Sequence, residues 1–236
     1  MAARGRHVAS LLLVYPGALG YAGVSTPIED VQQMLQEHQY DYDLVPADEL
    51  TKKARVVGSG IELRNETYEG IVVPGLESAT PELLEKLAEF AQAGIPVVFA
   101  DRSPSRVVQR ELNPEQWLSL LDAASFRLSE NPSRLPFVLR EAGVGPQIVF
   151  HGNGREHLRL LHRVRDGRNV WFLSNEDVSV AIAGWVRLPS MASGDSLLAW
   201  EPVTGSVGSR RNVQQADRRR SHGANSMLHC RLTDRC

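Results

Sequence analysis

Two carboxylates stand directly after apolar runs in the first half of the sequence, and they are the candidates for chemistry. These residues are Glu77 and Asp101. A pair of carboxylates is what general acid/base catalysis or glycoside cleavage requires. A structural interpretation competes with this one, in which Asp101 caps the backbone or pairs with Arg102 or Arg106, and Glu77 is solvated. We therefore assign no catalytic residue and keep Glu77 and Asp101 as the candidates to inspect.

Ser103 is a third polar side chain at the same place. A nucleophile elbow needs glycines around its serine or cysteine, and Ser103 has none beside it. Because Pro104 follows, Ser103 is predicted to be a helix N-cap instead. The chain has two cysteines, Cys230 and Cys236, which excludes a disulfide framework and a cysteine-based metal site from the residues before them.

The glycines and histidines indicate neither a cofactor nor a metal. Gly17, Gly20 and Gly23 have the wrong spacing for a dinucleotide loop or a phosphate loop, so no cofactor is predicted. His157 and His162 are five positions apart and would face opposite sides of one strand, which argues against shared metal ligation. His162 and the next residue, an arginine, either anchor an interface between two parts of the chain or are both exposed.

Three tryptophans in the second half offer a possible sugar platform, because an indole face stacks on a sugar ring. They are Trp171, Trp185 and Trp200. The competing interpretation places them in the core of a β-rich part. Carbohydrate is therefore one expected partner.

The charge balance argues against polyanionic partners. The chain of 236 residues has 26 Lys and Arg against 28 Asp and Glu, a formal net charge of −2. The part from Ser206 onward carries seven Arg and two Asp, which leaves −7 on residues 1–205. We expect no nucleic acid and no membrane partner, and we treat the run Arg218–Arg220 as an incidental basic segment.

The elements that would position these residues alternate between strands and helices in the first part of the chain. Four apolar runs are strand-like, and helical patterns with short connections separate them: the strands are 9–15, 40–45, 69–75 and 95–100, and the helices start near 28, 48 and 81. Thr26 and Thr80 each precede a proline and are expected to cap helices. Residues 55–63 form a predicted hairpin, and helices are expected at 113–123 and 135–142. This alternation of strands and helices predicts an open parallel sheet with helices on both faces over residues 7–145.

Beyond Gly145 the sequence becomes β-rich. Strands are predicted at 148–150, 158–164, 169–174, 178–186 and 196–200, with Asp166-Gly167 as a hairpin turn. We expect an antiparallel part over 146–205 and a disordered Arg-rich tail over 206–236.

The run at residues 8–15 has a second interpretation. Because Arg4, Arg6 and His7 precede it and small residues follow, it is also compatible with a signal peptide. A buried central strand is favoured, and with it a cytoplasmic over a secreted location, but the compartment stays open.

Four segments carry a resemblance to a known family. They are Leu13-Val14-Tyr15-Pro16, the run 40–45, the run 68–74 and the run 94–99. Together they resemble the accessory region of α-L-rhamnosidase-like glycoside hydrolases, those similar to family 106. Residues 161–163, 166–167, 171–175 and 200–205 are similar to the β-rich segment that follows in such enzymes. The resemblance covers residues 8–205.

The resemblance implies a flavodoxin-like, class I glutamine amidotransferase-like α/β domain followed by a partial antiparallel β-sandwich. In that family the catalytic carboxylates lie in a separate barrel, so no catalytic residue carries over. The expected function is a non-catalytic accessory or oligomerisation region, a fragment without the barrel, with the catalytic region or further copies of itself as partners. Two alternatives remain: a small hydrolase or amidotransferase-like enzyme using Glu77, Asp101 or Ser103, or a protein-interaction module.

Overall fold

A parallel sheet forms the centre of the first part of the molecule. The computed structural model describes residues 5–17, 23–108, 126–129, 131–188, 197–200, 205–210 and 227–232. The sheet has the strand order β11-β9-β7-β2-β3 and all its pairings are parallel: β2 is Leu11–Tyr15, β3 is Tyr42–Pro46, β7 is Gly70–Pro74, β9 is Val97–Ala100 and β11 is Arg127–Ser129. The four residues Leu11 to Val14 are fully buried, so the strand interpretation of this run is confirmed.

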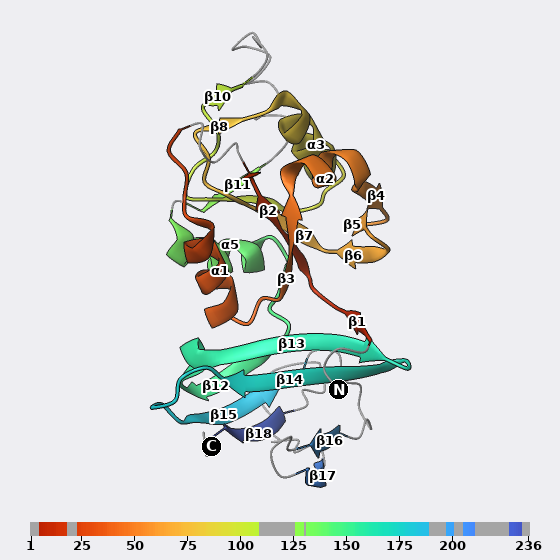
Figure 1. Cartoon of the computed structure of the whole chain (residues 1–236), viewed down its shortest axis with the longest axis vertical. Helices are drawn as coiled ribbons and strands as arrows, with labels where there is room; N and C mark the ends of the chain where they lie inside the picture. The colour runs from red at the N-terminus through yellow and green to blue at the C-terminus, as the bar shows by residue number, and fades with distance from the viewer. Residues whose placement is uncertain are drawn as a thin grey trace, which may run out of the picture.

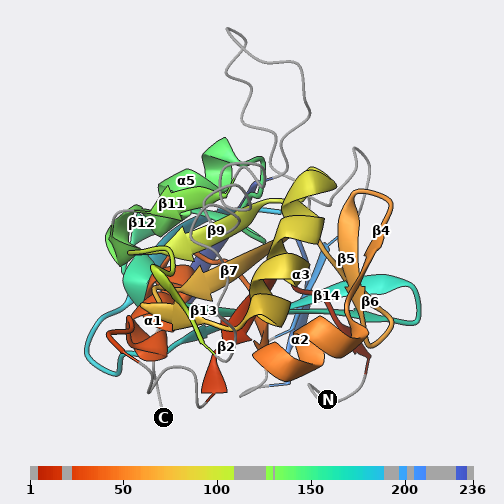
Figure 2. The same cartoon turned by 90° about the horizontal axis from the view of Figure 1, so that it is seen from above.

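Helices cover both faces of this sheet (Figures 1 and 2). On one face lie α1 and α5, whose buried side chains, among them Leu35 and Leu139, form one hydrophobic cluster with the sheet. On the other face lie α2 and α3, which bury Leu50 and Phe90 in a second cluster. Their bounds are Ile28–Glu37 for α1, Ala47–Lys53 for α2, Pro81–Gln92 for α3 and Leu135–Glu141 for α5. The helix expected at 113–123 lies outside the described residues.

The two predicted threonine caps have different outcomes. Thr80 accepts a hydrogen bond from the Leu83 amide at 3.3 Å and caps α3 as expected. Thr26 does not cap α1, since the helix begins after Pro27 without a side-chain cap. Ser103 was also expected to begin a helix, but residues 101–108 contain only the two-residue strand β10, Arg106–Val107, which pairs with β8, Ser78–Ala79.

Small antiparallel strands complete the α/β part. The predicted hairpin at 55–63 is confirmed and a third strand extends it. These strands are β4, Arg55–Val57, β5, Gly60–Leu63, and β6, Glu66–Tyr68.

The second part is antiparallel and sits beneath the first (Figure 1). One sheet has the order β1-β13-β14 and another β12-β15-β18, and their buried side chains meet in a third hydrophobic cluster that includes Phe150, Leu158 and Ile182. The strands are β1, Arg6–His7, β12, Val149–Asn153, β13, Leu158–Arg165, β14, Arg168–Asn175, β15, Ile182–Arg187, and β18, Met227–Leu232. The 3-10 helices η2, Pro132–Arg134, and η3, Arg155–His157, and the paired strands β16, Leu197–Trp200, and β17, Val207–Arg210, complete the described elements.

Three features of the second part differ from the expectation. The strand expected from residue 178 begins only at Ile182, because an Asp177 carboxylate oxygen accepts the amides of Ser179 at 2.7 Å and Val180 at 3.0 Å and turns the chain. The tail after residue 205 was expected to be disordered, yet β17 and β18 lie there and pair with β16 and β15. Strand β1 crosses from the first part into the second and pairs with β13.

Candidate functional site

The carboxyl ends of β7 and β9 bring the predicted carboxylates to one edge of the sheet. The chain segment 24–26 runs beside residues 75–77: the Thr26 amide donates to the Gly75 carbonyl at 2.8 Å, and the Glu77 amide donates to the Val24 carbonyl at 2.9 Å. This is the edge at which parallel α/β sheets hold ligands. Asp101 follows the neighbouring strand and faces the same segment.

Asp101 is held by three contacts. Thr26 Oγ1 donates to Asp101 Oδ2 at 3.0 Å, Arg102 Nε lies 3.0 Å from the same oxygen, and the Asp101 amide donates to the Ser129 carbonyl at 2.6 Å. The backbone of Asp101 has φ +82°, which is uncommon for a residue with a side chain. The pairing with Arg102 is one of the two partners that the structural interpretation named.

Glu77 joins two loops. Its Oε2 accepts the Val24 amide at 2.8 Å and its Oε1 lies 3.4 Å from a guanidinium nitrogen of Arg106. The Glu77 carbonyl accepts the amides of Ser105 and Arg106, both at 3.0 Å. No hydrogen bond joins Glu77 to Asp101 among the described residues. Each carboxylate therefore has its own cation and its own donors, an arrangement that orders the loops at this edge.

Two residues that the sequence reasoning missed shape this edge. A Cβ added to Gly75 would lie 2.4 Å from Thr26 Oγ1 and 2.6 Å from the Ala100 carbonyl oxygen, so the backbone passes here at a distance that only glycine allows. Thr26 was expected to cap a helix, and instead bridges the loop to Asp101. The Pro-Gly pair that stops β7 was the available signal for a close approach.

A second polar cluster lies where the two parts of the molecule meet. His162 is 5% exposed; its Nδ1 lies 3.2 Å from Gln147 Oε1, its Nε2 lies 3.0 Å from Asn169 Oδ1, and its ring stacks on Trp171 at 4.9 Å. Gln147 also donates to Ser10 Oγ at 2.6 Å, across the junction. Burial lowers the pKa of His162, so the ring is neutral near pH 7. The alternative in which His162 is exposed is therefore wrong, and it is the His162 backbone that contacts Val8 and Asp41 across the junction.

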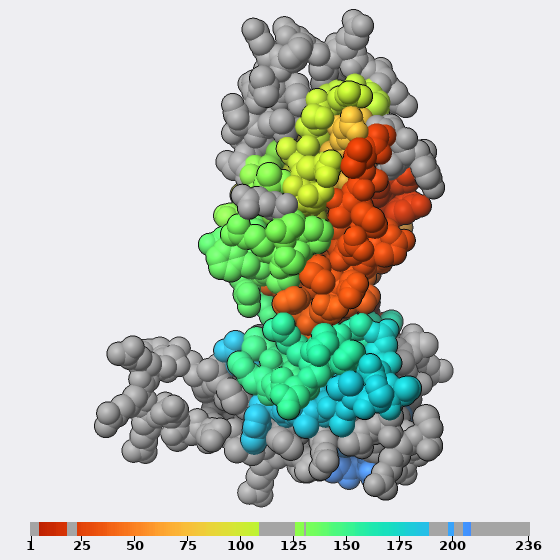
Figure 3. Space-filling model, turned by 90° about the vertical axis from the view of Figure 1, so that its left-hand side faces the viewer, coloured from red at the N-terminus to blue at the C-terminus, as the bar shows by residue number. Residues whose placement is uncertain are grey.

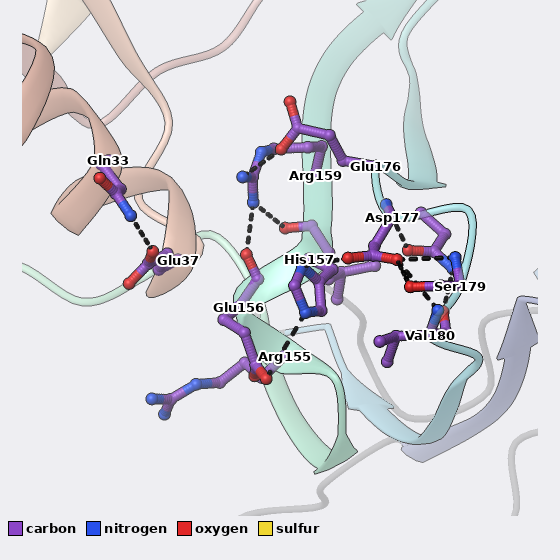
Figure 4. Close-up of polar contacts among 12 residues, drawn as sticks. Gln33, Glu37, Arg155, Glu156, His157, Arg159, Glu176, Asp177, Ser179 and Val180 are labelled. Atoms are coloured by element: carbon purple, nitrogen blue, oxygen red, sulfur yellow. Dashed lines mark hydrogen bonds and ion pairs between the residues drawn. The ribbon is translucent and has the colours of Figure 1, made fainter.

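His157 has a different environment from His162. It ends η3, where its ring lies 3.6 Å from an Asp177 oxygen and 3.8 Å from a Glu156 oxygen (Figure 4). Asp177 holds the turn to Val180, and Glu156 lies on the side toward α1. In the part of the chain that the structure describes, no three His, Cys, Asp or Glu side chains gather in a way that could hold a metal ion.

The sequence reasoning also missed a charged cluster at the junction. His7 lies between two carboxylates, with Nε2 2.9 Å from Asp41 Oδ2 and Nδ1 3.0 Å from Asp43 Oδ1. Hydrogen bonds to Asp41 and then to Asp43 raise the pKa of His7 to about 10. The spacing of Asp41 and Asp43 was the available signal, since residues two apart in a strand share a face.

Comparisons with known proteins give a fold and no family. No model of a protein family and no curated protein matches the sequence. Among solved structures, a rhamnosidase from Novosphingobium sp. PP1Y superposes with a TM-score of 0.69 at 18% identity, over 97% of this chain and 22% of its own. An exo-carrageenase GH42 from Bacteroides ovatus gives 0.52 at 13% identity, over 94% and 28%. A β-galactosidase from Bacillus circulans sp. alkalophilus gives 0.57 at 11% identity, over 98% and 41%.

The chain folds like part of a glycoside hydrolase. It spans 22% of the rhamnosidase and 41% of the β-galactosidase, so most of each enzyme has no counterpart in it. The glycoside hydrolase-like segment is a mixed α/β fold with one parallel sheet and several antiparallel ones. No described helix is both long and apolar enough to cross a bilayer.

The three tryptophans of this glycoside hydrolase-like segment lie on three different sheets. Trp171 of β14 packs against the third hydrophobic cluster, Trp185 of β15 is half-buried, and Trp200 of β16 is 43% exposed. Trp171 therefore fits the core interpretation, and the sugar platform stays a prediction for Trp200.

Proposed function

We propose that this chain is a non-catalytic accessory or oligomerisation region of an α-L-rhamnosidase-like glycoside hydrolase. The observation that carries the proposal is the asymmetry of the superposition, in which 97% of this chain corresponds to 22% of the rhamnosidase. In this proposal the segment supports, orients or assembles a larger catalytic body. Its partners would be that body, further copies of itself, or carbohydrate.

We infer a flavodoxin-like, amidotransferase-like domain over residues 7–145 and a partial β-sandwich after it. The strand order β3-β2-β7-β9-β11 supports this, because it reproduces the order 2-1-3-4-5 of flavodoxin-like sheets. The chain has no cysteine before Cys230, so the body has no amidotransferase thiol nucleophile.

The contacts of the two carboxylates support a non-catalytic role. An acid/base pair must face a shared substrate, with one carboxyl raised in pKa and the other ionised. Asp101 and Glu77 are instead occupied by Thr26, by the Val24 amide and by separate arginines.

The first test is turnover of aryl α-L-rhamnosides by the purified full chain. We expect no activity above background. Robust turnover that Asp101→Asn or Glu77→Gln abolishes, while Glu82→Gln on the exposed face of α3 leaves it intact, would overturn the proposal in favour of a small hydrolase.

The second test reads the genomic sequence on both sides of this frame for a barrel-coding region. We expect such a region, and we expect the chain joined to it to gain rhamnosidase activity or a defined oligomeric state relative to the barrel alone. A barrel that is equally active and equally assembled without this chain would contradict an accessory role.

A further inference from the structure

Residues 5–8 form a strap that leaves the α/β part and enters the β part (Figure 1). Within it, Arg6 pairs with Val164 and His7 with Arg163 of β13, and the Val8 amide donates to the His162 carbonyl at 3.0 Å. The space-filling view shows the two parts in direct contact (Figure 3). A two-residue strand has few ladder bonds, so backbone pairing alone gives the strap little hold.

The side chain of His7 binds the strap more firmly, through hydrogen bonds to residues of the α/β part. Both ring nitrogens lie at hydrogen-bond distance from carboxylate oxygens, Nε2 at 2.9 Å from Asp41 and Nδ1 at 3.0 Å from Asp43. A carboxylate only accepts, so both nitrogens must carry a proton and the ring must be an imidazolium. These charge-assisted bonds are about twice as strong as neutral ones.

The carboxylates are themselves fixed by neutral donors. Tyr68 donates its hydroxyl to Asp43 Oδ2 at 2.7 Å, and the His162 amide lies 3.4 Å from Asp41 Oδ2. Each carboxylate thus bonds to β1 and also to β6 or β13, which places the strap at the meeting point of three elements.

The other charged groups around His7 leave this arrangement intact. Arg6 pairs with Glu66 of β6, Arg64 pairs with Glu49 of α2, and Arg163 of β13 donates to the Gly5 carbonyl. Several charged or titratable groups face His7. They are Arg6 of β1, Asp41 just before β3, Asp43 of β3, Arg64 in the turn before β6, Glu66 and Tyr68 of β6, and His162 and Arg163 of β13. Each of these arginines therefore pairs with an acceptor other than Asp41, and His7 is the cation that binds Asp41.

We propose that His7, Asp41 and Asp43 form an ionic latch that fastens the strap to the α/β part and releases it in acid, when Asp43 becomes protonated. Release would free the edge of β13 and loosen the junction while the central sheet stays folded. The proposal concerns the coupling of the two parts and does not depend on which enzyme the chain belongs to.

The pKa values define the range over which the latch holds. The pKa of His7 is raised to about 10, so its contribution to stability is complete below 6.5 and is lost as pH rises through about 10. The pKa of Asp43 lies below its ordinary 3.8, mainly because of the hydrogen bond from His7, so its contribution is present above that value and is lost as pH falls through the lowered value. The latch is closed between these limits; it opens in acid as Asp43 is protonated and in alkali as His7 loses its charge.

The latch is tested by hydrogen exchange on the full chain, followed by NMR and corrected for intrinsic rates. The Val8 amide should be protected at pH 6, and its protection should fall as the pH is lowered below 3.8, by up to about tenfold for each pH unit, while the Leu13 amide of β2 keeps its protection. Simultaneous loss at Val8 and Leu13, or unchanged protection at Val8, overturns the proposal.

Variants separate the latch from general stability. His7→Gln, which carries no charge and has one donor nitrogen where the imidazolium has two, should lose Val8 protection at pH 6 by about tenfold, and His151→Gln on the exposed side of β12 should not. Equal Val8 protection in His7→Gln and the wild type overturns the proposal. If His7→Gln does not fold, the ring titration decides in the wild type: a His7 that still carries both protons at pH 8.5 supports the latch, and one that titrates near 6.5 refutes it.

Discussion

Tyr40 gives a direct measure of how firmly the end of the α/β part is tied to the chain that leaves it. The side chain is 3% exposed, and its hydroxyl lies 3.2 Å from the Pro136 carbonyl oxygen and 3.2 Å from the Val144 carbonyl oxygen. Pro136 belongs to α5, and Val144 stands beyond that helix on the way to β12. The substitution Tyr40→Phe removes the hydroxyl and keeps the ring.

The expected change in the free energy of unfolding depends on whether each carbonyl oxygen keeps a hydrogen-bond donor once the hydroxyl is removed. The Pro136 carbonyl lies in the first turn of α5, where the helix's own ladder supplies a donor, so its loss is small. The Val144 carbonyl lies outside the helix and would lose the hydroxyl as donor. A net hydrogen bond is worth about 0.5–1.5 kcal/mol, and a buried group left without a partner costs about 1–3 kcal/mol. We expect Tyr40→Phe to lower the free energy of unfolding by about 1–2 kcal/mol, since no cavity is created.

Urea unfolding checks this value. The midpoint should fall with an unchanged m-value, and the matched variant Tyr15→Phe, whose ring is 42% exposed, should stay within about 0.5 kcal/mol of the wild type. Burial raises the pKa of Tyr40 to about 12, so above pH 10 the unfolded chain loses this proton first and stability falls as pH rises. Tyr40→Phe should remove that part of the alkaline loss. If Tyr40→Phe were as stable as the wild type both near pH 7 and above pH 10, the reasoning would be refuted.

Two further substitutions probe the helix start and the tight edge of the sheet. Thr80→Ala should cost about 1 kcal/mol, because the Leu83 amide loses its cap, and thermal unfolding measures it. A melting temperature equal to that of the wild type would show that water replaces the cap. Gly75→Ala should cost about 1–3 kcal/mol or more, because the new Cβ would overlap Thr26 Oγ1 and the Ala100 carbonyl. Gly145→Ala, where a Cβ meets open space, is its control, and equal stability of the two variants would contradict the close approach.

The local elements of the α/β part could be predicted because each carries its own signal. The run at 11–15 is apolar without interruption and forms the buried central strand. Thr80 and Pro81 define the start of α3, and the Gly-Ser-Gly of the 55–63 hairpin defines its turn. Here local preference and final structure agree.

The pairings that cross the molecule could not be predicted in the same way. Strand β1 has only two residues, too few to show alternation of apolar and polar residues. Strand β18 forms by pairing with the edge of β15, so it does not depend on such alternation in its own sequence. Their positions depend on a partner edge far along the chain. Asp177 shows the reverse effect, since its side chain turns a segment whose β-branched residues predicted a strand.

The sequence predicted where the candidate site lies in the sheet better than it predicted which residues its carboxylates contact. Glu77 and Asp101 do lie at one edge, as the rule for parallel strands requires. Their partners were only partly foreseen: Arg102 and Arg106 were named, while Thr26 and the Val24 amide come from a segment about 50 or more positions earlier, brought there by tertiary folding. His7 was missed because its chemistry exists only once β1 and β3 lie together.

The strap also bears on the order in which the protein folds. Arg163 and the Gly5 carbonyl that it contacts are 158 positions apart, so residues 5–8 are synthesised well before the strand β13 with which they pair. At a synthesis rate of roughly 5–20 residues per second, that interval is on the order of 10–30 seconds. The parallel sheet has all its described strands well before then, and the strap must dock onto a body that is already formed. Closing so long a loop is slow, and between the synthesis of β13 and the docking of the strap β13 would present an open edge to other chains.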